Sequence, residues 1–175
     1  MMFGNPEDFA IEVESDATDA SPASTVWGHM RIWCRGVSFG DFKERHCGLS
    51  GTHQALVRLS ATLHELISKE FPGLDDSGVW HFLDQKLYRD DERTLSEVDR
   101  DAREYSRFDF LTNWGESFDD YKGFVFCRDD GVHAVVMGPG AYELRCVRVS
   151  QHGFRSAVAG FDAWCLEVEA ERGRR

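Results

Sequence analysis

The sequence lacks the features that would place it in a membrane or in a disulfide-bonded scaffold. No stretch approaches the roughly 18 uninterrupted apolar residues that a bilayer crossing requires. The first ten residues include Pro6, Glu7 and Asp8 and no basic segment, so they are not expected to form a signal peptide. The five cysteines are an odd number at wide spacing without a CxxC pair, which argues against a disulfide framework. These absences predict a cytoplasmic protein. Four cysteines lie in apolar runs and are expected in the core: Cys34, Cys127, Cys146 and Cys165.

Catalytic signatures are absent as well. The chain contains no GxSxG, GxxxxGK[ST], GxGxxG or HExxH segment. The best metal candidate is the irregular cluster of His46, Cys47 and His53, to which His29 or His64 would add a fourth ligand. Two adjacent ligands are awkward for one zinc ion, which favours short paired spacings. We therefore predict no metal, no cofactor and no catalytic residue. A small enzyme that uses Cys47 with His46 or His53 is an alternative hypothesis.

Positive charge is scarce relative to negative charge. Twenty lysines and arginines stand against 31 aspartates and glutamates, a net charge of −11. From Asp75 to Asp130 the acidic residues exceed the basic ones by eight, and after that segment the basic residues exceed by one. A field of this sign repels nucleic acid and anionic lipid and attracts a basic protein, although solubility alone also explains it. The acidic residues form clusters: Asp75-Asp76, Asp90-Asp91-Glu92, Asp119-Asp120 and Asp129-Asp130.

The N-terminal part has the alternation of strands. A chain of 175 residues with 13 phenylalanines and five tryptophans suits one folded domain, residues 1–175. Phe9 to Glu14 and Val26 to Cys34 are predicted strands, separated by a small, polar loop at Ser15 to Thr25. Arg35-Gly36 is a candidate tight turn into a third strand, Val37 to Phe42.

The middle part changes to the period of helices. Apolar residues recur at steps of three and four from Thr52 to Glu70, which predicts an amphipathic helix that Pro72-Gly73 ends. Its inward positions are Leu56, Leu59, Leu63, Leu66 and Ile67. A second helix, capped by Asp76 or Ser77, is expected to reach about Tyr88. Thr94 and Glu97 have the spacing of a capping box and begin a third, more polar helix.

The strand pattern then returns. Lys122 to Arg128 and Val132 to Met137 flank Asp129-Asp130-Gly131, which predicts a hairpin. Tyr142 to Val149 is a further strand, and a last helix runs from about Gly153 to Ala170. The order βββ-ααα-βββ-α predicts an α+β fold with an antiparallel sheet and helices packed mainly on one face.

The segment from Phe108 to Tyr121 carries aromatic residues among polar turn residues, outside any clean period. Aromatic side chains in a loop either anchor the loop to the core or form an interface hot spot. Both interpretations apply to Trp114.

Several strings in the sequence resemble one family. They are Phe3-Gly4-Asn5-Pro6-Glu7 before the first strand, Trp33-x-x-Gly36-x-x-x-Gly40-Asp41, and Phe108-Asp109 followed by Leu111-Thr112-Asn113-Trp114-Gly115-Glu116 and Phe118-Asp119. The chain resembles the immunity protein 42 family in this order from Phe3 to the final helix. The resemblance implies a bacterial cytosolic protein, encoded beside a secreted polymorphic toxin, that binds and blocks that toxin without a catalytic residue.

We therefore predict a protein that inhibits a cognate toxin domain by binding it, with a basic toxin surface as the complement of the acidic charge. No nucleic acid and no membrane is expected as a partner, and an adaptor domain without toxin antagonism is a second alternative. The residues predicted to contact the toxin are Asp75, Asp76, Asp90, Asp91, Glu92, Trp114, Glu116, Asp119 and Asp120.

Overall fold

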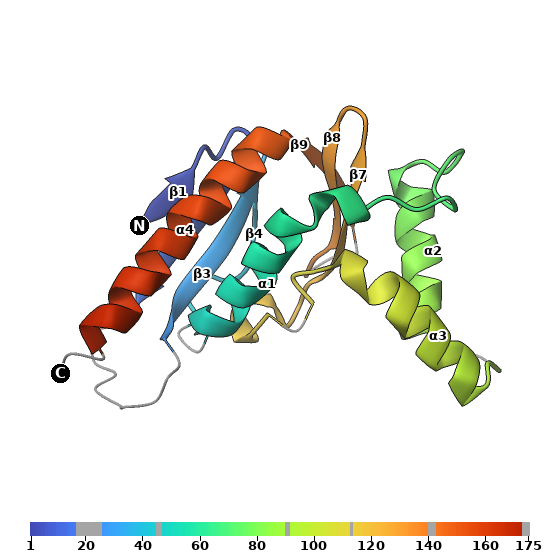
Figure 1. Cartoon of the computed structure of the whole chain (residues 1–175), viewed down its shortest axis with the longest axis horizontal. Coiled ribbons are helices and arrows are strands. Elements are labelled where there is room, and N and C mark those ends of the chain that lie inside the picture. Colours follow the sequence, from blue (N-terminus) through green and yellow to red (C-terminus); the bar gives the residue numbers. More distant parts are fainter. Residues whose placement is uncertain (17–25, 45–46, 90–91, 113, 140–142, 173–175) are drawn as a thin grey trace.

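The computed structural model of the chain describes residues 1–16, 26–44, 47–89, 92–112, 114–139 and 143–172. They form an α+β fold with two antiparallel sheets and four α-helices (Figure 1). The first sheet has the order β1-β2-β3-β4, with β5 paired to β3, and its strands are β1 (Met2–Gly4), β2 (Phe9–Ser15), β3 (Trp27–Cys34), β4 (Val37–Phe39) and β5 (Cys47–Gly48). The second sheet has the order β6-β7-β8-β9, and its strands are β6 (Asp109–Phe110), β7 (Lys122–Arg128), β8 (Gly131–Met137) and β9 (Leu144–Val149).

The helices divide between the two sheets. The α-helices are α1 (Leu49–Ala61), α2 (Asp76–Tyr88), α3 (Leu95–Tyr105) and α4 (Gln151–Arg172), and short 3-10 turns are η1 (Leu63–Glu65), η2 (Ser106–Phe108) and η3 (Glu116–Phe118). The α1 and α4 helices pack together over one face of the first sheet, whereas α2 packs on the second sheet and α3 on α2 (Figure 1). The second sheet therefore stands between these two helical layers.

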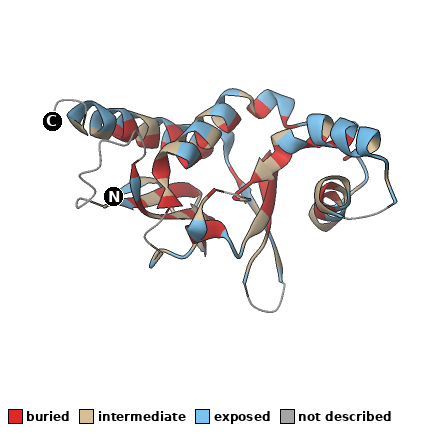
Figure 2. Ribbon diagram, turned by 90° about the horizontal axis from the view of Figure 1, so that it is seen from below, coloured by how far each residue is buried: buried red, intermediate tan, exposed pale blue. Residues whose placement is uncertain are grey.

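The burial of the strands follows from this arrangement. In β3 the inward residues Met30, Ile32 and Cys34 are fully buried, and they alternate with partly exposed residues on the opposite face. In the second sheet the strands β7 and β8 are buried on both faces (Figure 2). Phe124 contacts Trp80 and Tyr88 of α2, Phe126 lies on the same face, and the intervening Val125 points the other way. Residues of both sheets belong to one contiguous hydrophobic core. None of the described helices is long and apolar enough to cross a membrane.

The predicted α+β class is confirmed, and the strands divide into two sheets where one was expected. The β3–β4 hairpin turns at Arg35 and Gly36, whose φ angles of 54° and 79° are both left-handed, as a two-residue hairpin turn requires. The hairpin of β7 and β8, the strand β9 and the final helix also lie where the sequence predicts them. The predicted loop at residues 17–25 lies outside the described residues. Strands β1, β5 and β6 were not predicted, because each has only two or three residues.

The first helix ends earlier than its periodicity predicts. It stops at Ala61, where the Thr62 amide bonds back to the carbonyls of Arg58 and Leu59, and a 3-10 turn follows. The chain turns here so that the Leu66 carbonyl accepts the amide of Cys127 from β7 at 2.6 Å. Leu66 is buried as expected, whereas Ile67 is 61% exposed, so its predicted inward position is wrong. The cap of α2 also differs by one residue, since Asp75 accepts the amide of Gly78 at 2.7 Å.

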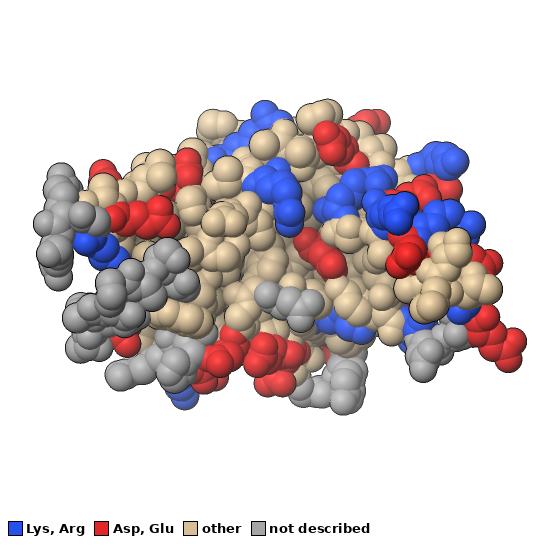
Figure 3. Space-filling model, turned by 60° about the horizontal axis from the view of Figure 1, so that its bottom comes forward, with Lys and Arg blue, Asp and Glu red and all other residues tan. Residues whose placement is uncertain are grey.

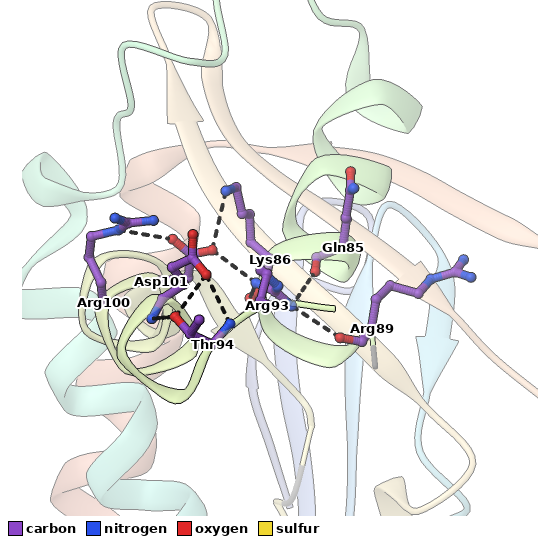
Figure 4. A network of polar contacts seen from close by, with 8 residues as sticks. Gln85, Lys86, Arg89, Arg93, Thr94, Arg100 and Asp101 are labelled. Atoms are coloured by element: carbon purple, nitrogen blue, oxygen red, sulfur yellow. Dashed lines mark hydrogen bonds and ion pairs between the residues drawn. The ribbon is translucent and has the colours of Figure 1, made fainter. Parts of the chain in front are cut away.

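Helix α3 is attached to α2 by charged side chains (Figure 4). The capping box of Thr94 and Glu97 is present as predicted. Asp101 is 2% exposed and accepts hydrogen bonds from Lys86 Nζ at 3.2 Å and from Arg93 Nη1 at 2.9 Å. Burial alone would raise the pKa of Asp101, but these two bonds outweigh it and lower the pKa. Arg93 also donates to three carbonyls near the end of α2, those of Gln85, Lys86 and Arg89.

Replacing Asp101 with alanine should lower the free energy of unfolding by about 2 kcal/mol, because Lys86 and Arg93 would keep their charges without the carboxylate. Urea unfolding measures this change. Asp99→Ala is the matched control, because Asp99 is exposed on the same helix, and it should stay within about 0.5 kcal/mol of the wild type. Equal stabilities of the two variants would contradict the role assigned to Asp101.

Candidate functional site

The segment from Asp109 to Tyr121 links the two sheets. It begins as β6, which pairs with β7 of the second sheet through Asp109 opposite Phe124. It then crosses to the first sheet, where the Ser117 carbonyl accepts the amide of Asp41 at 2.8 Å. This segment contains the aromatic residues that the sequence singled out, and its position between the sheets explains their burial.

Trp114 anchors the segment. Its side chain is 9% exposed and packs edge-on against Phe110 and Phe118, with ring centroids 5.1 and 6.1 Å apart. Its carbonyl accepts the Thr52 hydroxyl of α1 at 2.8 Å and the Cys47 thiol of β5 at 3.6 Å. Of the two interpretations that the sequence left open, the geometry thus supports the anchor for the indole ring.

Two glycines allow the segment to approach the first sheet closely. Gly115 has a φ of 113°, and a Cβ there would lie 3.4 Å from the thiol sulfur of Cys47. Gly40 has a φ of 105°, and a Cβ there would lie 2.8 Å from the ring of Phe118. Both glycines belong to the family-like strings of the sequence, and both have a backbone conformation that other residues rarely adopt. The buried Leu111 also has a positive φ, 68°, so the fold imposes strain on this segment.

Two hollows meet at η3, where both are lined by Glu116. The groove, about 800 Å³, runs between α1 and the linking segment, and its lining residues include Trp27, Thr52, Arg58, Glu65, Arg107, Asp109, Trp114 and Glu116. The second hollow, the basin, has a volume of about 700 Å³, and its lining residues are Gly40, Asp41, Glu44, Glu116, Ser117, Asp119, Asp120, Tyr121 and Pro139. We call the two hollows together the η3 surface.

The basin is strongly acidic. Five of its nine lining residues carry a carboxylate, and among the described residues no lysine or arginine lines it. Asp41, Asp119 and Asp120 are exposed. Figure 3 shows acidic side chains gathered along the lower edge of the face that it presents. Carboxylates held this close together create a negative potential that reaches beyond the surface.

The structure brings four of the predicted contact residues together and leaves the others apart. Trp114, Glu116, Asp119 and Asp120 line the η3 surface, although the Trp114 ring is largely buried. Asp75 caps α2, and Asp76 lies 3.0 Å from His133 and 3.5 Å from Arg128, so both have roles within the fold. Glu92 is exposed and follows α2, whose 13 residues span about 20 Å from the helix start at Asp76. Asp90 and Asp91 lie outside the described residues.

Sequence reasoning missed Asp41, Glu44 and Asp109. The first two reach the basin only because the amide of Asp41 bonds to the carbonyl of Ser117, a contact between distant parts of the chain. The family-like Gly40-Asp41 pair was the one local signal for this position. Asp109 stood in a family-like string too, but nothing in the sequence indicated that it would line a groove.

The alternative Cys/His site does not assemble among the described residues. His53 Nε2 lies 2.6 Å from Asp162 on α4, whereas the Cys47 thiol is buried against Trp114. Burial raises the pKa of Cys47 to about 11, which disfavours the thiolate. His29 bonds to the Phe42 carbonyl, and no three potential ligands among the described residues are placed to hold a metal ion. His46 lies outside the described residues.

Known proteins share the sequence family and the fold of this chain. The model of the family described as Immunity protein 42 matches residues 1–164. No curated protein matches the chain. Among solved structures, the chain is similar to CdiI from Burkholderia dolosa AUO158, with a TM-score of 0.65 and 16% sequence identity over 94% of this chain and 99% of that one. At this identity the likeness establishes the shared fold.

Replacing Thr52 with valine should lower the free energy of unfolding by about 1 to 2 kcal/mol, because the Trp114 carbonyl would lose its hydroxyl donor in a buried place. Thr62→Val is the matched control, because the Thr62 hydroxyl makes a similar bond to the Arg58 carbonyl in contact with solvent. Chemical denaturation compares the two. A Thr52 variant no less stable than the Thr62 variant would contradict the anchoring role.

The cysteines should differ in reactivity. Cys34, Cys47, Cys127 and Cys165 are buried, but Cys146 is exposed, so its predicted place in the core is wrong: β9 is an edge strand. A thiol reagent at about pH 8.5 should label one thiol per native chain, and Cys146→Ser should abolish that labelling. Partial burial raises the pKa of Cys146, which slows the reaction. Rapid labelling of Cys47 would contradict this assignment.

Proposed function

Because the chain belongs to the immunity protein 42 family, we propose that it neutralises its cognate toxin by covering the toxin with the η3 surface. The protein is an immunity protein, a non-enzymatic inhibitor that neutralises a toxin. The alternative of a Cys/His enzyme is therefore wrong. The choice of surface and the chemistry of the toxin are the new elements of the proposal.

The acidic basin is the observation that carries the proposal. Its five carboxylates form a concentrated charge that draws a basic surface toward this side of the protein. Charge of this kind mainly accelerates association, and well-packed contacts then keep the partner bound. The groove next to the basin offers such contacts, since Trp27 at its edge is 38% exposed. We infer that the toxin presents a basic element to the basin and inserts neighbouring side chains into the groove.

The tight fixing of η3 supports the same choice. The Trp114 carbonyl is bonded to Thr52 of α1 and Cys47 of β5, and the Ser117 carbonyl is bonded to Asp41, which follows β4. Such a surface loses little conformational freedom when a partner binds, so more of the contact energy appears as affinity. We place this interaction in the cytoplasm of the toxin-producing cell, where five unpaired cysteines would stay reduced.

Reversing two basin charges with Asp119→Lys and Asp120→Lys should slow association with the cognate toxin domain about tenfold at low salt and should flatten the salt dependence of that rate. Stopped-flow or surface plasmon resonance over a series of salt concentrations measures both effects. Both side chains are exposed, so the variant should fold normally.

The control has the same net charge. Glu167→Lys with Glu169→Lys changes two exposed residues on α4 that line neither the groove nor the basin. It should bind with little change beyond the general effect of net charge. If both double variants lose the same rate, the basin has no special role, and the proposed surface is wrong while the inhibitory function stands.

A further inference from the structure

Asp109 is a carboxylate in the groove that lacks a cationic partner in the described part of the chain. Its Oδ1 accepts a hydrogen bond from the hydroxyl of Tyr88 at 2.6 Å, a neutral donor. Lys122, the cation whose charge lowers the pKa of Asp109, binds the buried Asp84 at 2.9 Å and lies over the Tyr88 ring. Asp109 is therefore partly withdrawn from water without the charge compensation that Asp84 and Asp101 receive.

The charged groups around Asp109 do not compensate its negative charge within the described residues. Burial raises the pKa of Asp109, and the opposing effects of the Tyr88 bond and the Lys122 charge do not cancel the rise. Among the groove residues, Arg107 donates to the Glu65 and Glu104 carbonyls and covers the ring of Phe108 at 4.5 Å. The remaining charged residues that line the groove are Arg58 from α1, Glu65 from η1 and Glu116 from η3. None of them forms an ion pair with Asp109 within the described residues.

We propose that the groove receives an arginine or lysine side chain of the toxin, which pairs with Asp109. This inference rests on the proposed function and adds the residue that selects the partner. A toxin cation that pairs with Asp109 meets a carboxylate that folding has already partly withdrawn from water. Less of the cost of desolvating this carboxylate therefore remains to be met when the toxin binds. A toxin with an apolar side chain at this place would instead seal an unpaired carboxylate away from water. The same residue therefore favours the cognate toxin and disfavours others.

The variant that tests this pairing is Asp109→Asn. An asparagine oxygen can still accept the Tyr88 hydroxyl, so the shape and the internal bond are kept while the charge is lost. Because burial destabilises the carboxylate, we expect this variant to melt at the same temperature as the wild type or above it. That result would separate a binding role from a structural one. Glu167→Gln, which removes an exposed carboxylate on α4 that lines neither the groove nor the basin, is the matched control.

Binding of the cognate toxin domain to these three proteins gives the answer. Asp109→Asn should raise Kd by about 30-fold or more, mostly through faster dissociation, and Glu167→Gln should change Kd by no more than about twofold. Pairing with a cation lowers the pKa of Asp109 below the raised pKa that burial gives it in the free protein, so the wild type should lose affinity as the pH falls through that raised pKa. The loss should be smaller for Asp109→Asn. Equal Kd values and parallel pH profiles for the wild type and Asp109→Asn would overturn the inference.

A second measurement separates this inference from the proposed function. N-acetyl-arginine amide, added at millimolar concentration, should shift the NMR signals of Asp109 and Thr112 in the wild type and not in the Asn variant. If the basin variants slow association and Asp109→Asn has no effect, the inference fails and the proposed surface stands. If the toxin does not bind through the η3 surface at all, the proposed surface fails. The pairing of Asp109 with a toxin cation then fails as well. An absent shift in the wild type overturns the pairing in either case.

Discussion

The hydrogen bond from the Thr52 hydroxyl to the Trp114 carbonyl fastens the linking segment, Asp109 to Tyr121, to α1, the helix that packs on the first sheet. The same segment is bound to the second sheet through β6, so it joins the two halves of the core. Both hollows of the η3 surface are lined by this segment, which means that their shapes depend on where it is held. The burial of Trp114 thus has an indirect functional consequence, because it sets Glu116, Asp119 and Asp120 at fixed positions on the surface.

The carboxylates between Asp75 and Asp130 are of two kinds, structural and displayed on the surface. Some stabilise the fold: Asp84 binds Lys122 and Arg89, whose bonds outweigh burial and lower its pKa. Asp130, bound by His133 and Arg148, has its pKa lowered to about 2. Others, such as Asp119 and Asp120, are displayed in the basin. Net charge cannot distinguish the two kinds, since only the fold decides which carboxylates meet a cation within the chain.

Local signals in the sequence predicted much of the fold. Thr94 with Glu97 marked a helix start, and Arg35-Gly36 and Asp129-Asp130-Gly131 marked hairpins, because the backbone geometry at these places depends on neighbouring residues. The division into two sheets was missed because the alternation within a strand does not specify which distant strands it pairs with, so nothing local separates β1–β4 from β7–β9. Only part of the basin was predicted. Asp119 and Asp120 are adjacent in the sequence and were predicted together, whereas Asp41 joins them through a backbone contact between distant parts of the chain.

The central claim is that an immunity protein of this family covers its toxin with the η3 surface. Hydrogen–deuterium exchange of the chain, alone and saturated with the cognate toxin domain, tests that claim most directly. We predict slower exchange in the complex at the amides of residues 114–121 and 40–44, which line the groove and the basin. Unchanged exchange in both segments, together with protection confined to α4 or to the outer face of the first sheet, would contradict it.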